Sequence, residues 1–415
     1  MSQTNKLILS LDLGSFSTKG ILAEMFFQKK TIEVIKSIET KSTGIRKGII
    51  FDVENVADLL SSLLSQMEES SKKEIDQIIV LIGGPCLEIR NVKSSIIVSR
   101  PDEEITEADI KRVNEAIYTL PIPQNRSILN LLPKNYIIDD LDEVKDPVQM
   151  KGSRLALQAT VIDIFNQEKN NLNKVFNILG IPQTQSLLWS NILISSKVLI
   201  SQRDREQGVC AIDFGAETTS LAIYEDDNLI HLAIIPLGSQ NITNDIANSL
   251  RIHFESAERI KVNYGCALPS KVSKNETIEL SQFVEGEEEV VTKKLVSEII
   301  EARLSEILSF VNNELKKIGK ASKLPAGAVI YGNGSAIPYF KELVKKELKM
   351  SVRKANYDDY KNIINVDLPF QFLPAYSALI EYFLENREGG TFLTFRLNPQ
   401  NFLSSIKKFF ENFRT

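Results

Sequence analysis

Two stretches of the chain, 6-KLILSLDLGSFSTKGILA-23 and 208-GVCAIDFGAETTSLAI-223, share one pattern although they have few identical residues. Each is an apolar run that ends in Asp-x-Gly, followed by a short polar turn and a second apolar run. This pattern predicts two β-hairpins, each with an aspartate and a glycine at its tip. Strand and helix patterns follow each hairpin, so we expect an α/β fold built twice, as two related halves.

The hairpin tips carry the residue types that a nucleoside triphosphate with magnesium requires. Phosphates need backbone N–H donors from a tight glycine turn, and a hydrated magnesium ion needs carboxylate oxygens. A single Asp-x-Gly hairpin is more often only a turn, but these two occur at matching places in the two halves. We predict that Asp12 and Asp213 hold Mg²⁺ through water and that the two tips clamp the phosphates. The predicted phosphate-binding residues are Gly14, Ser15, Thr18, Lys19, Gly215, Ala216, Thr218 and Thr219.

A later stretch, 328-AVIYGNGSAIP-338, predicts a strand, a glycine turn and the start of a helix. Glycines at such a turn let a purine and a ribose approach the backbone closely. Glu258 and Lys261 lie three residues apart on one face of a predicted helix, where they suit ribose and purine, although an exposed ion pair is the simpler interpretation. The predicted cofactors are thus ATP and Mg²⁺. The predicted nucleoside contacts are Glu258, Lys261, Gly332, Asn333, Gly334 and Ser335.

Composition narrows the class of protein. The net charge of −5 argues against a general nucleic-acid binder, which needs clustered Lys and Arg. The three cysteines and two histidines show no metal-ligand spacing, and such sparse cysteines indicate a reducing compartment. The N-terminus has no signal-peptide pattern, and no apolar run approaches the ~20 residues that span a bilayer. We expect a protein that stays in the cytoplasm.

The order of these elements resembles the actin, sugar-kinase and chaperone ATPase superfamily, with a connecting element at 180–199 between the two phosphate hairpins. Within it, four stretches resemble the FtsA family of bacterial cell-division proteins, and the likeness runs from residue 6 to about 385. These stretches are KGIIFD at 47–52, LPKNYIID at 132–139, DPV and GSRL at 146–155, and AERIKVNYGCA at 257–267. The resemblance implies an actin-like (ribonuclease H-like) fold, with two halves around a nucleotide cleft and an inserted α+β subdomain in the first half.

The insert interrupts the first half near Pro85. Its pattern predicts strands at 94–98, 128–132, 136–138 and 154–160, and a helix at 106–117 that begins with a capping box of Thr106 and Asp109.

The expected division of the whole chain is as follows: 1–84, 162–204 and 369–388 for the first-half core, 85–161 for the insert, 205–236 and 313–368 for the second-half core, 237–312 for an outer subdomain, and 389–415 for a linker and an amphipathic helix.

The resemblance also implies partners. Members of the family polymerise and bind the C-terminal tail of the tubulin-like protein FtsZ through the outer subdomain of the second half, together with other proteins of the division machinery. Arg303 matches a basic position that the family uses for that tail, and Lys293 is a looser match. A solvated helix face is the competing interpretation for both residues.

The last residues predict a membrane-binding helix that starts near Pro399 or Gln400. At about 100° per residue its apolar side chains fall within an arc of about 120°. A stripe of phenylalanines flanked by cations suits the inner leaflet of the cell membrane at the division septum, although a helix packed on the body or in a partner's groove is the alternative. The predicted membrane-contacting residues are Phe402, Leu403, Ile406, Lys407, Phe409, Phe410 and Phe413.

Three features depart from the superfamily. Glu217 brings a negative charge near the phosphates unless its side chain points away, and Asn333 stands where a third glycine is common. Around Trp189, in the connecting helix, no Glu or Gln is available to position water, so we predict ATP binding with at most slow hydrolysis and no catalytic residue. The alternatives are a pilus-assembly protein of the PilM type, which shares the insert, and a small-molecule kinase, for which no acceptor-side base is evident.

Overall fold

The computed structural model of the chain describes residues 5–71, 73–99, 104–284, 289–364 and 369–387. The predicted linker and membrane helix at 389–415, with Phe402, Leu403, Ile406, Lys407, Phe409, Phe410 and Phe413, lie outside the described residues.

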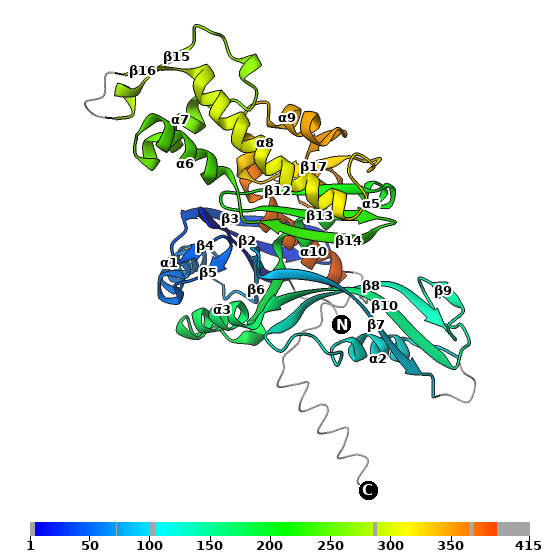
Figure 1. The fold of residues 1–415 in the computed structure, drawn as a ribbon. Helices are drawn as coiled ribbons and strands as arrows, with labels where there is room; N and C mark the ends of the chain where they lie inside the picture. Colours follow the sequence, from blue (N-terminus) through cyan, green and yellow to red (C-terminus); the bar gives the residue numbers. More distant parts are fainter. Residues whose placement is uncertain (1–4, 72, 100–103, 285–288, 365–368, 388–415) are drawn as a thin grey trace.

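Two five-stranded sheets of the same topology form the centre of the molecule (Figure 1). In each sheet the first three strands of the half are joined antiparallel as neighbours, and two parallel strands follow beside the first one. The predicted duplication is thereby confirmed. The first sheet has the order β3 (Thr31–Lys41), β2 (Ser17–Phe26), β1 (Lys6–Leu13), β6 (Gln77–Ile82) and β11 (Ser186–Ser190). The second has the order β14 (Asn228–Ile235), β13 (Thr219–Glu225), β12 (Val209–Phe214), β17 (Ala328–Tyr331) and β18 (Val352–Lys354).

The first sheet is buried on both faces because its central strand carries apolar side chains on both sides. Leu7, Leu9 and Leu11 of β1 pack with the helices α1 (Val53–Ser71) and α3 (Asn166–Ile178). Ile8 of β1 points to the opposite face and packs with α4 (Asn191–Leu199) and α10 (Leu373–Arg387). Successive residues of a strand point to opposite faces, so this continuous apolar run covers two layers of helices.

The helix α4 joins the halves. Its Leu193 and Leu199 share one buried cluster with Val209 and Ala211 of the second sheet, while Ile194 packs with the first. The sequence prediction placed Trp189 in this connecting helix. That was wrong, because Trp189 lies in strand β11, paired in parallel with Leu81, and α4 begins at Asn191. The connection continues through α5 (Gln202–Gln207) into β12.

Helices cover the outer face of the second sheet and extend beyond it. Cys210, Ile212 and Phe214 of β12 pack in a core with residues of these helices. A small hairpin of β15 (Thr277–Glu279) and β16 (Val290–Thr292) lies before the longest helix. The helices are α6 (Ser239–Leu250), α7 (Phe254–Tyr264), α8 (Lys293–Lys317) and α9 (Phe340–Leu348).

The insert is a four-stranded antiparallel sheet with one helix, and it projects from the first half (Figure 1). The predicted capping box of its helix is confirmed, since the backbone N–H of Thr106 donates to the Asp109 carboxylate at 3.0 Å. The two strands predicted at 128–132 and 136–138 are in fact one long strand that carries a register shift opposite Gln158 and Ala159. The elements are β7 (Leu87–Ile97), α2 (Glu107–Ile117), β8 (Arg126–Ile138), β9 (Asp142–Val144) and β10 (Arg154–Phe165).

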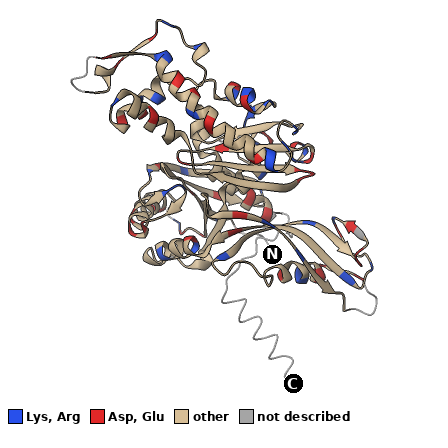
Figure 2. Ribbon diagram, in the orientation of Figure 1, with Lys and Arg blue, Asp and Glu red and all other residues tan. Residues whose placement is uncertain are grey.

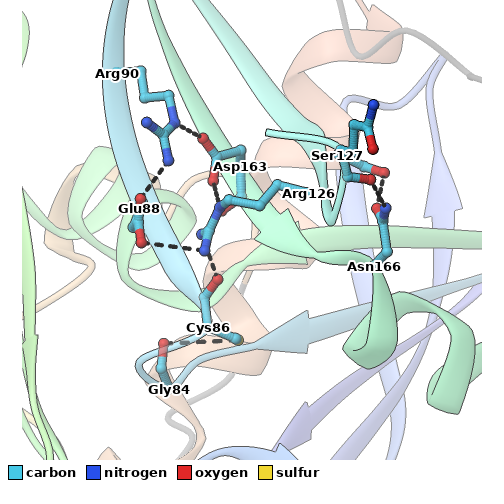
Figure 3. A network of polar contacts seen from close by, with 9 residues as sticks. Gly84, Cys86, Glu88, Arg90, Arg126, Ser127, Asp163 and Asn166 are labelled. Carbon is cyan, nitrogen blue, oxygen red and sulfur yellow. Dashed lines mark hydrogen bonds and ion pairs between the residues drawn. The ribbon is translucent and has the colours of Figure 1, made fainter. Parts of the chain in front are cut away.

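A cluster of charged side chains fixes the base of the insert to the core (Figure 3). The fully buried carboxylate of Asp163 accepts hydrogen bonds from Arg126 and Arg90. Arg126 also donates to the carbonyl oxygen of Cys86 at 2.7 Å and stacks over the ring of Phe165, 4.1 Å from its centroid. A buried carboxylate needs this many partners, and the contacts join strands β7, β8 and β10 at the end of the insert that enters the core.

Charges of both signs are mixed along the outer helices, whereas the ribbons of the central sheets carry few of them (Figure 2). Among the described helices, none is both long and apolar enough to cross a membrane.

Candidate nucleotide site

A cavity of about 350 Å³ lies between the two halves and is lined by both predicted hairpin tips. The tips are the links β1–β2 and β12–β13, which hold Gly14 and Gly215 at equivalent places. The structure brings together thirteen of the sixteen residues predicted for the nucleotide and its metal. They are Asp12, Gly14, Ser15, Lys19, Asp213, Gly215, Ala216, Thr218, Glu258, Lys261, Gly332, Asn333 and Gly334.

Three predicted residues do not line the cavity, and their hydroxyl groups form hydrogen bonds within the protein. Thr18 is fully buried, and its hydroxyl group is 2.9 Å from that of Ser42. The hydroxyl of Thr219 donates to the carbonyl oxygen of Leu237, and that of Ser335 donates to the carbonyl oxygen of Gly332. The role predicted for these three residues in nucleotide binding stays a prediction.

The hairpin tips are tight enough to require glycine. A Cβ atom on Gly14 would lie 2.6 Å from the carbonyl oxygen of Ser17, closer than real Cβ atoms come. The N–H of Gly215 donates to the carbonyl oxygen of Thr218 at 2.9 Å, which closes the second tip in the same way. Each tip thus exposes backbone at the cavity wall, where N–H groups can meet phosphate oxygens.

Two carboxylates face the same closed space. Burial raises the pKa of Asp12, against the opposing effects of Lys19, whose Nζ lies 4.0 Å from its Oδ2, and of Asn191, which donates to its Oδ1 at 2.8 Å. Burial and the neighbouring charge of Asp12 raise the pKa of Asp213 to about 7. Two carboxylates with one nearby lysine leave a site short of positive charge.

That charge deficit fits a hydrated divalent cation. A cluster of three or more His, Cys, Asp or Glu side chains, able to hold a metal ion directly, is not found in the described part of the chain. Mg²⁺ keeps several waters and is commonly bound through one or two carboxylates together with substrate phosphates. Asp12 and Asp213 supply such a pair of carboxylates beside the two glycine-containing hairpin tips.

The predicted adenosine loop packs directly behind the second tip. Gly332, with φ of +83°, could not carry a Cβ atom, which would lie 2.3 Å from Oδ1 of Asp213. A Cβ atom on Gly334 would meet the ring of Phe214 at 2.5 Å. Both glycines are needed for this close contact, whereas Asn333 between them lies in a short 3₁₀ helix, Asn333–Ala336, and tolerates a side chain.

Glu258 and Lys261 form an ion pair of 2.7 Å at the cavity wall. Lys261 is only 6% exposed, so the simpler interpretation of a solvated pair does not hold. Its ammonium group also donates to the hydroxyl of Thr243 at 2.9 Å and to the carbonyl oxygen of Ser239 at 3.2 Å. Burial lowers the pKa of Lys261, while Glu258 acts in the opposite direction.

Sequence reasoning missed several lining residues. Asn191 was overlooked because its role depends on where α4 begins, at the end of a strand that was predicted as helix. The glycines Gly48, Gly83 and Gly84 are three of only nineteen in the chain, and the pair 83–84 ends a predicted strand, so a glycine search at strand ends would have found them. Phe370 and Gln371 come from a distant segment without a recognisable pattern.

The two cations predicted for a peptide partner are already paired within the chain. Arg303 of α8 forms two hydrogen bonds with the Asp245 carboxylate of α6, at 2.5 and 2.8 Å, and also pairs with Glu306. Lys293, the first residue of α8, pairs with Glu276 at 2.7 Å. A partner carboxylate at either position would have to compete with these groups.

The duplicated sheets, with two glycine turns and a carboxylate pair facing each other between them, define an actin-like fold. Solved structures agree with this class. The PilM-PilN type IV pilus biogenesis complex contains a chain with a TM-score of 0.62 at 13% identity, covering 92% of this chain and 98% of its own. MreB5 of Spiroplasma citri bound to ADP gives a TM-score of 0.55 at 15% identity, covering 93% and 99%. At such identities the likeness concerns the fold alone.

Sequence comparison specifies the family. A family model described as "Cell division protein FtsA" matches residues 210–368, and one described as "SHS2 domain inserted in FTSA" matches residues 87–163. The cell division protein FtsA of Bacillus subtilis is 32% identical over 352 residues, 85% of this chain and 79% of its own length. That of Pseudomonas aeruginosa is 29% identical, over 85% and 83%. The chain belongs to the FtsA family of cell division proteins, and the pilus-assembly alternative has only the likeness of fold.

Proposed function

We propose that this cell-division protein binds ATP with Mg²⁺ between its halves, assembles into filaments and links FtsZ to the inner face of the cell membrane at the septum. The observation that carries the nucleotide proposal is the convergence of both glycine hairpins and both aspartates on one cavity. Closure of the two halves on the nucleotide would license assembly.

Within this cavity we assign each group a binding role. Backbone N–H groups of the two hairpin tips that make no bond within their own turn would meet the phosphates, and the ammonium group of Lys19 would balance their charge. Mg²⁺, when bound, neutralises phosphate charge through waters held by Asp12 and Asp213. Glu258 and Lys261, with the turn at Gly332, Asn333 and Gly334, would hold the ribose and the purine. Because the residues around Trp189 include no Glu or Gln to position water, we expect hydrolysis to be slow.

The partner roles rest on the family and on the sequence of the tail. We assign the FtsZ tail to the outer subdomain at 237–312, with Arg303 and Lys293 as candidate contacts once released from Asp245 and Glu276. The stripe of Phe402, Leu403, Ile406, Phe409, Phe410 and Phe413, bordered by Lys407, would enter the membrane interface. Burial of six such residues contributes on the order of 5–10 kcal/mol before ordering costs.

The first test is nucleotide binding by calorimetry, with ATP and ADP, in the presence and absence of Mg²⁺. We expect ATP to bind with Mg²⁺, and Asp12→Asn to weaken the effect of the metal more than the binding of the nucleotide alone. Equal binding with and without Mg²⁺ in the unaltered protein would contradict the metal role. Unchanged affinity in Asp12→Asn would exclude the cavity as the site.

The membrane role has a separate test. The full chain and a truncation after Gly390 are sedimented with anionic vesicles in the presence of ATP. Pelleting of the full chain alone, abolished by Phe409→Glu, supports the tether. If both proteins stay in the supernatant, the tail does not bind membranes.

A further inference from the structure

A two-residue turn lies at the mouth of the nucleotide cavity. The short strands β4 (Ile45–Arg46) and β5 (Ile49–Ile50) pair antiparallel and are joined by Lys47 and Gly48. These two residues have φ of +50° and +72°, which is the left-handed pair of a type I′ turn. Lysine is unusual at the first of these positions, where Asn, Asp or Gly is preferred. A strained residue of this kind persists only where its surroundings hold it.

The N–H groups of Lys47 and Gly48 both donate to side chains of the phosphate hairpins. The N–H of Gly48 donates to Oγ of Ser15 at 2.8 Å, in the hairpin of the same half. The N–H of Lys47 donates to Oε2 of Glu217 at 2.5 Å, in the hairpin of the other half. The turn therefore touches both phosphate hairpins, and the Glu217 contact crosses from one half to the other.

The turn is itself anchored in the first half. The N–H of Ile50 donates to Glu168 at 3.2 Å, and the side-chain amide of Asn171 donates to the carbonyl oxygen of Ile50 at 2.9 Å. A Cβ atom on Gly84 would lie 2.4 Å from the carbonyl oxygen of Lys47, so the turn rests directly on the glycine pair that ends β6. Any opening of the halves must break the contact to Glu217, because the turn moves with the first half.

We propose that Glu217 is a positioning residue that latches the second phosphate hairpin to the turn of Lys47 and Gly48, and so slows the release of bound nucleotide. The contact also explains how a glutamate is accommodated at a phosphate loop. Its carboxylate is directed to a backbone N–H across the cleft, and hydrogen bonds of this charged kind are stronger than neutral ones. The inference rests on the nucleotide binding proposed above.

The test compares Glu217→Ala and Glu217→Gln with the unaltered full chain. Release of a fluorescent ATP analogue is followed by stopped flow after mixing with excess ATP. We expect release about tenfold faster for Glu217→Ala and a smaller increase for Glu217→Gln, whose amide oxygen still accepts the N–H without a charge. Glu225→Gln is the matched control, since Glu225 pairs with Lys320 inside the second half and is expected to leave release unchanged.

A second readout needs no nucleotide. Hydrogen–deuterium exchange of the Lys47 amide should become faster in Glu217→Ala, while that of the Gly48 amide, held by Ser15, should stay the same. Unchanged release together with unchanged exchange at Lys47 would overturn the latch. Slower release in Glu217→Ala would also overturn it, since the carboxylate would then repel the phosphates. If the unaltered chain binds no nucleotide, the proposed function fails, whereas the amide exchange still decides on the contact.

Discussion

At the scale of single residues, the properties of the site depend on a carboxyl group that is difficult to ionise. The pKa of Asp213 is raised to about 7 by burial and by the charge of Asp12, while an aspartate in the unfolded chain titrates near pH 4. Between these values the folded protein holds a proton that the unfolded chain has lost. The free energy of unfolding therefore falls as the pH rises through this window.

The first prediction follows from this sign. In the nucleotide-free protein, Asp213→Asn should remove the decline in the free energy of unfolding between about pH 4 and 7. At pH 8 the variant should be more stable than the parent by about 1–2 kcal/mol. This gain is smaller than the full pKa shift implies because the cavity admits water. Urea unfolding at pH 5, 6, 7 and 8 measures the free energy of unfolding of the parent and the variant. A variant with the same pH slope as the parent would show that another group titrates.

The second prediction concerns a glycine that packs on the same carboxylate. In Gly332→Ala the added Cβ atom would meet Oδ1 of Asp213, so we expect nucleotide affinity to fall at least about tenfold and stability to fall by about 1–3 kcal/mol. Gly319→Ala is the control. Gly319 also has a positive φ, of +69°, but its Cβ atom would have nothing within 4 Å. Equal losses of affinity in both variants would mean that backbone strain alone is responsible.

Local sequence patterns predicted thirteen residues of the site because a hairpin tip carries its own signature. The rest depends on distance in three dimensions. Asn191 reaches Asp12 across 179 residues of sequence, and Glu217 reaches Lys47 across 170. Neither pairing leaves a trace in a single sequence. The hydroxyl partners of Thr18, Thr219 and Ser335 could not be predicted for the same reason.

At the scale of elements, the third prediction addresses the base of the insert. Asp163→Ala leaves the buried guanidinium group of Arg126 with the half-exposed Glu88 as its remaining carboxylate partner, so the free energy of unfolding should fall by about 3–5 kcal/mol. Glu298→Ala is the control. Glu298 pairs with Lys294 on α8 at 3.6 Å, but both side chains are about half exposed, and we expect a loss below about 1 kcal/mol. Urea unfolding measures the free energy of unfolding of both variants. Similar losses in the two would contradict a special contribution of the buried Arg126–Asp163 pair to stability.

The fourth prediction distinguishes the pairing of Arg303 with Asp245 from its proposed binding of the FtsZ tail. Both Arg303→Ala and Asp245→Ala break the pairing of α6 with α8 and should each lower stability by about 1 kcal/mol. If Arg303 binds the FtsZ tail, only Arg303→Ala weakens tail binding, because Asp245→Ala releases the guanidinium group for the partner. Fluorescence anisotropy with a labelled FtsZ tail peptide measures this. Equal weakening would show that the pair acts only through the packing of the helices.

Helix patterns were the most predictable elements. The helix expected at 106–117 corresponds to α2, because the period of its apolar residues and its first residues are both local signals. Strands were harder. The break predicted near Pro133 in β8 is a register shift of one long strand. β11 was taken for helix because its short run, Ser186–Ser190, shows no alternation of apolar and polar residues.

At the scale of the whole molecule, the duplication made the fold predictable. Once the hairpin occurs twice, the second sheet must repeat the strand order of the first, and the cavity lies where the two tips meet. The sequence did not reveal that α4 packs on both sheets, which makes it the element shared by the two halves.

The fifth prediction uses this arrangement. A ligand that binds only the folded cavity stabilises the protein by about 2.7 kcal/mol at a hundredfold excess over its Kd. For a chain of this size that corresponds to a rise in Tm of about 3 °C. ATP with Mg²⁺ should produce this rise in a calorimetric scan, and the tenfold weaker binding expected for Gly332→Ala should reduce the rise to about half at the same concentration. An undiminished rise in Gly332→Ala would place the ligand elsewhere.

The clamp of Arg126 and Asp163 lies close to a helix of the first half. Strand β10, which carries Asp163, ends at Phe165, and α3 begins at the next residue. Within two turns, α3 holds both polar backbone groups of Ile50 through Glu168 and Asn171. If a neighbouring molecule displaced the insert, α3 would carry the movement to the turn of Lys47 and Gly48, which contacts both phosphate hairpins.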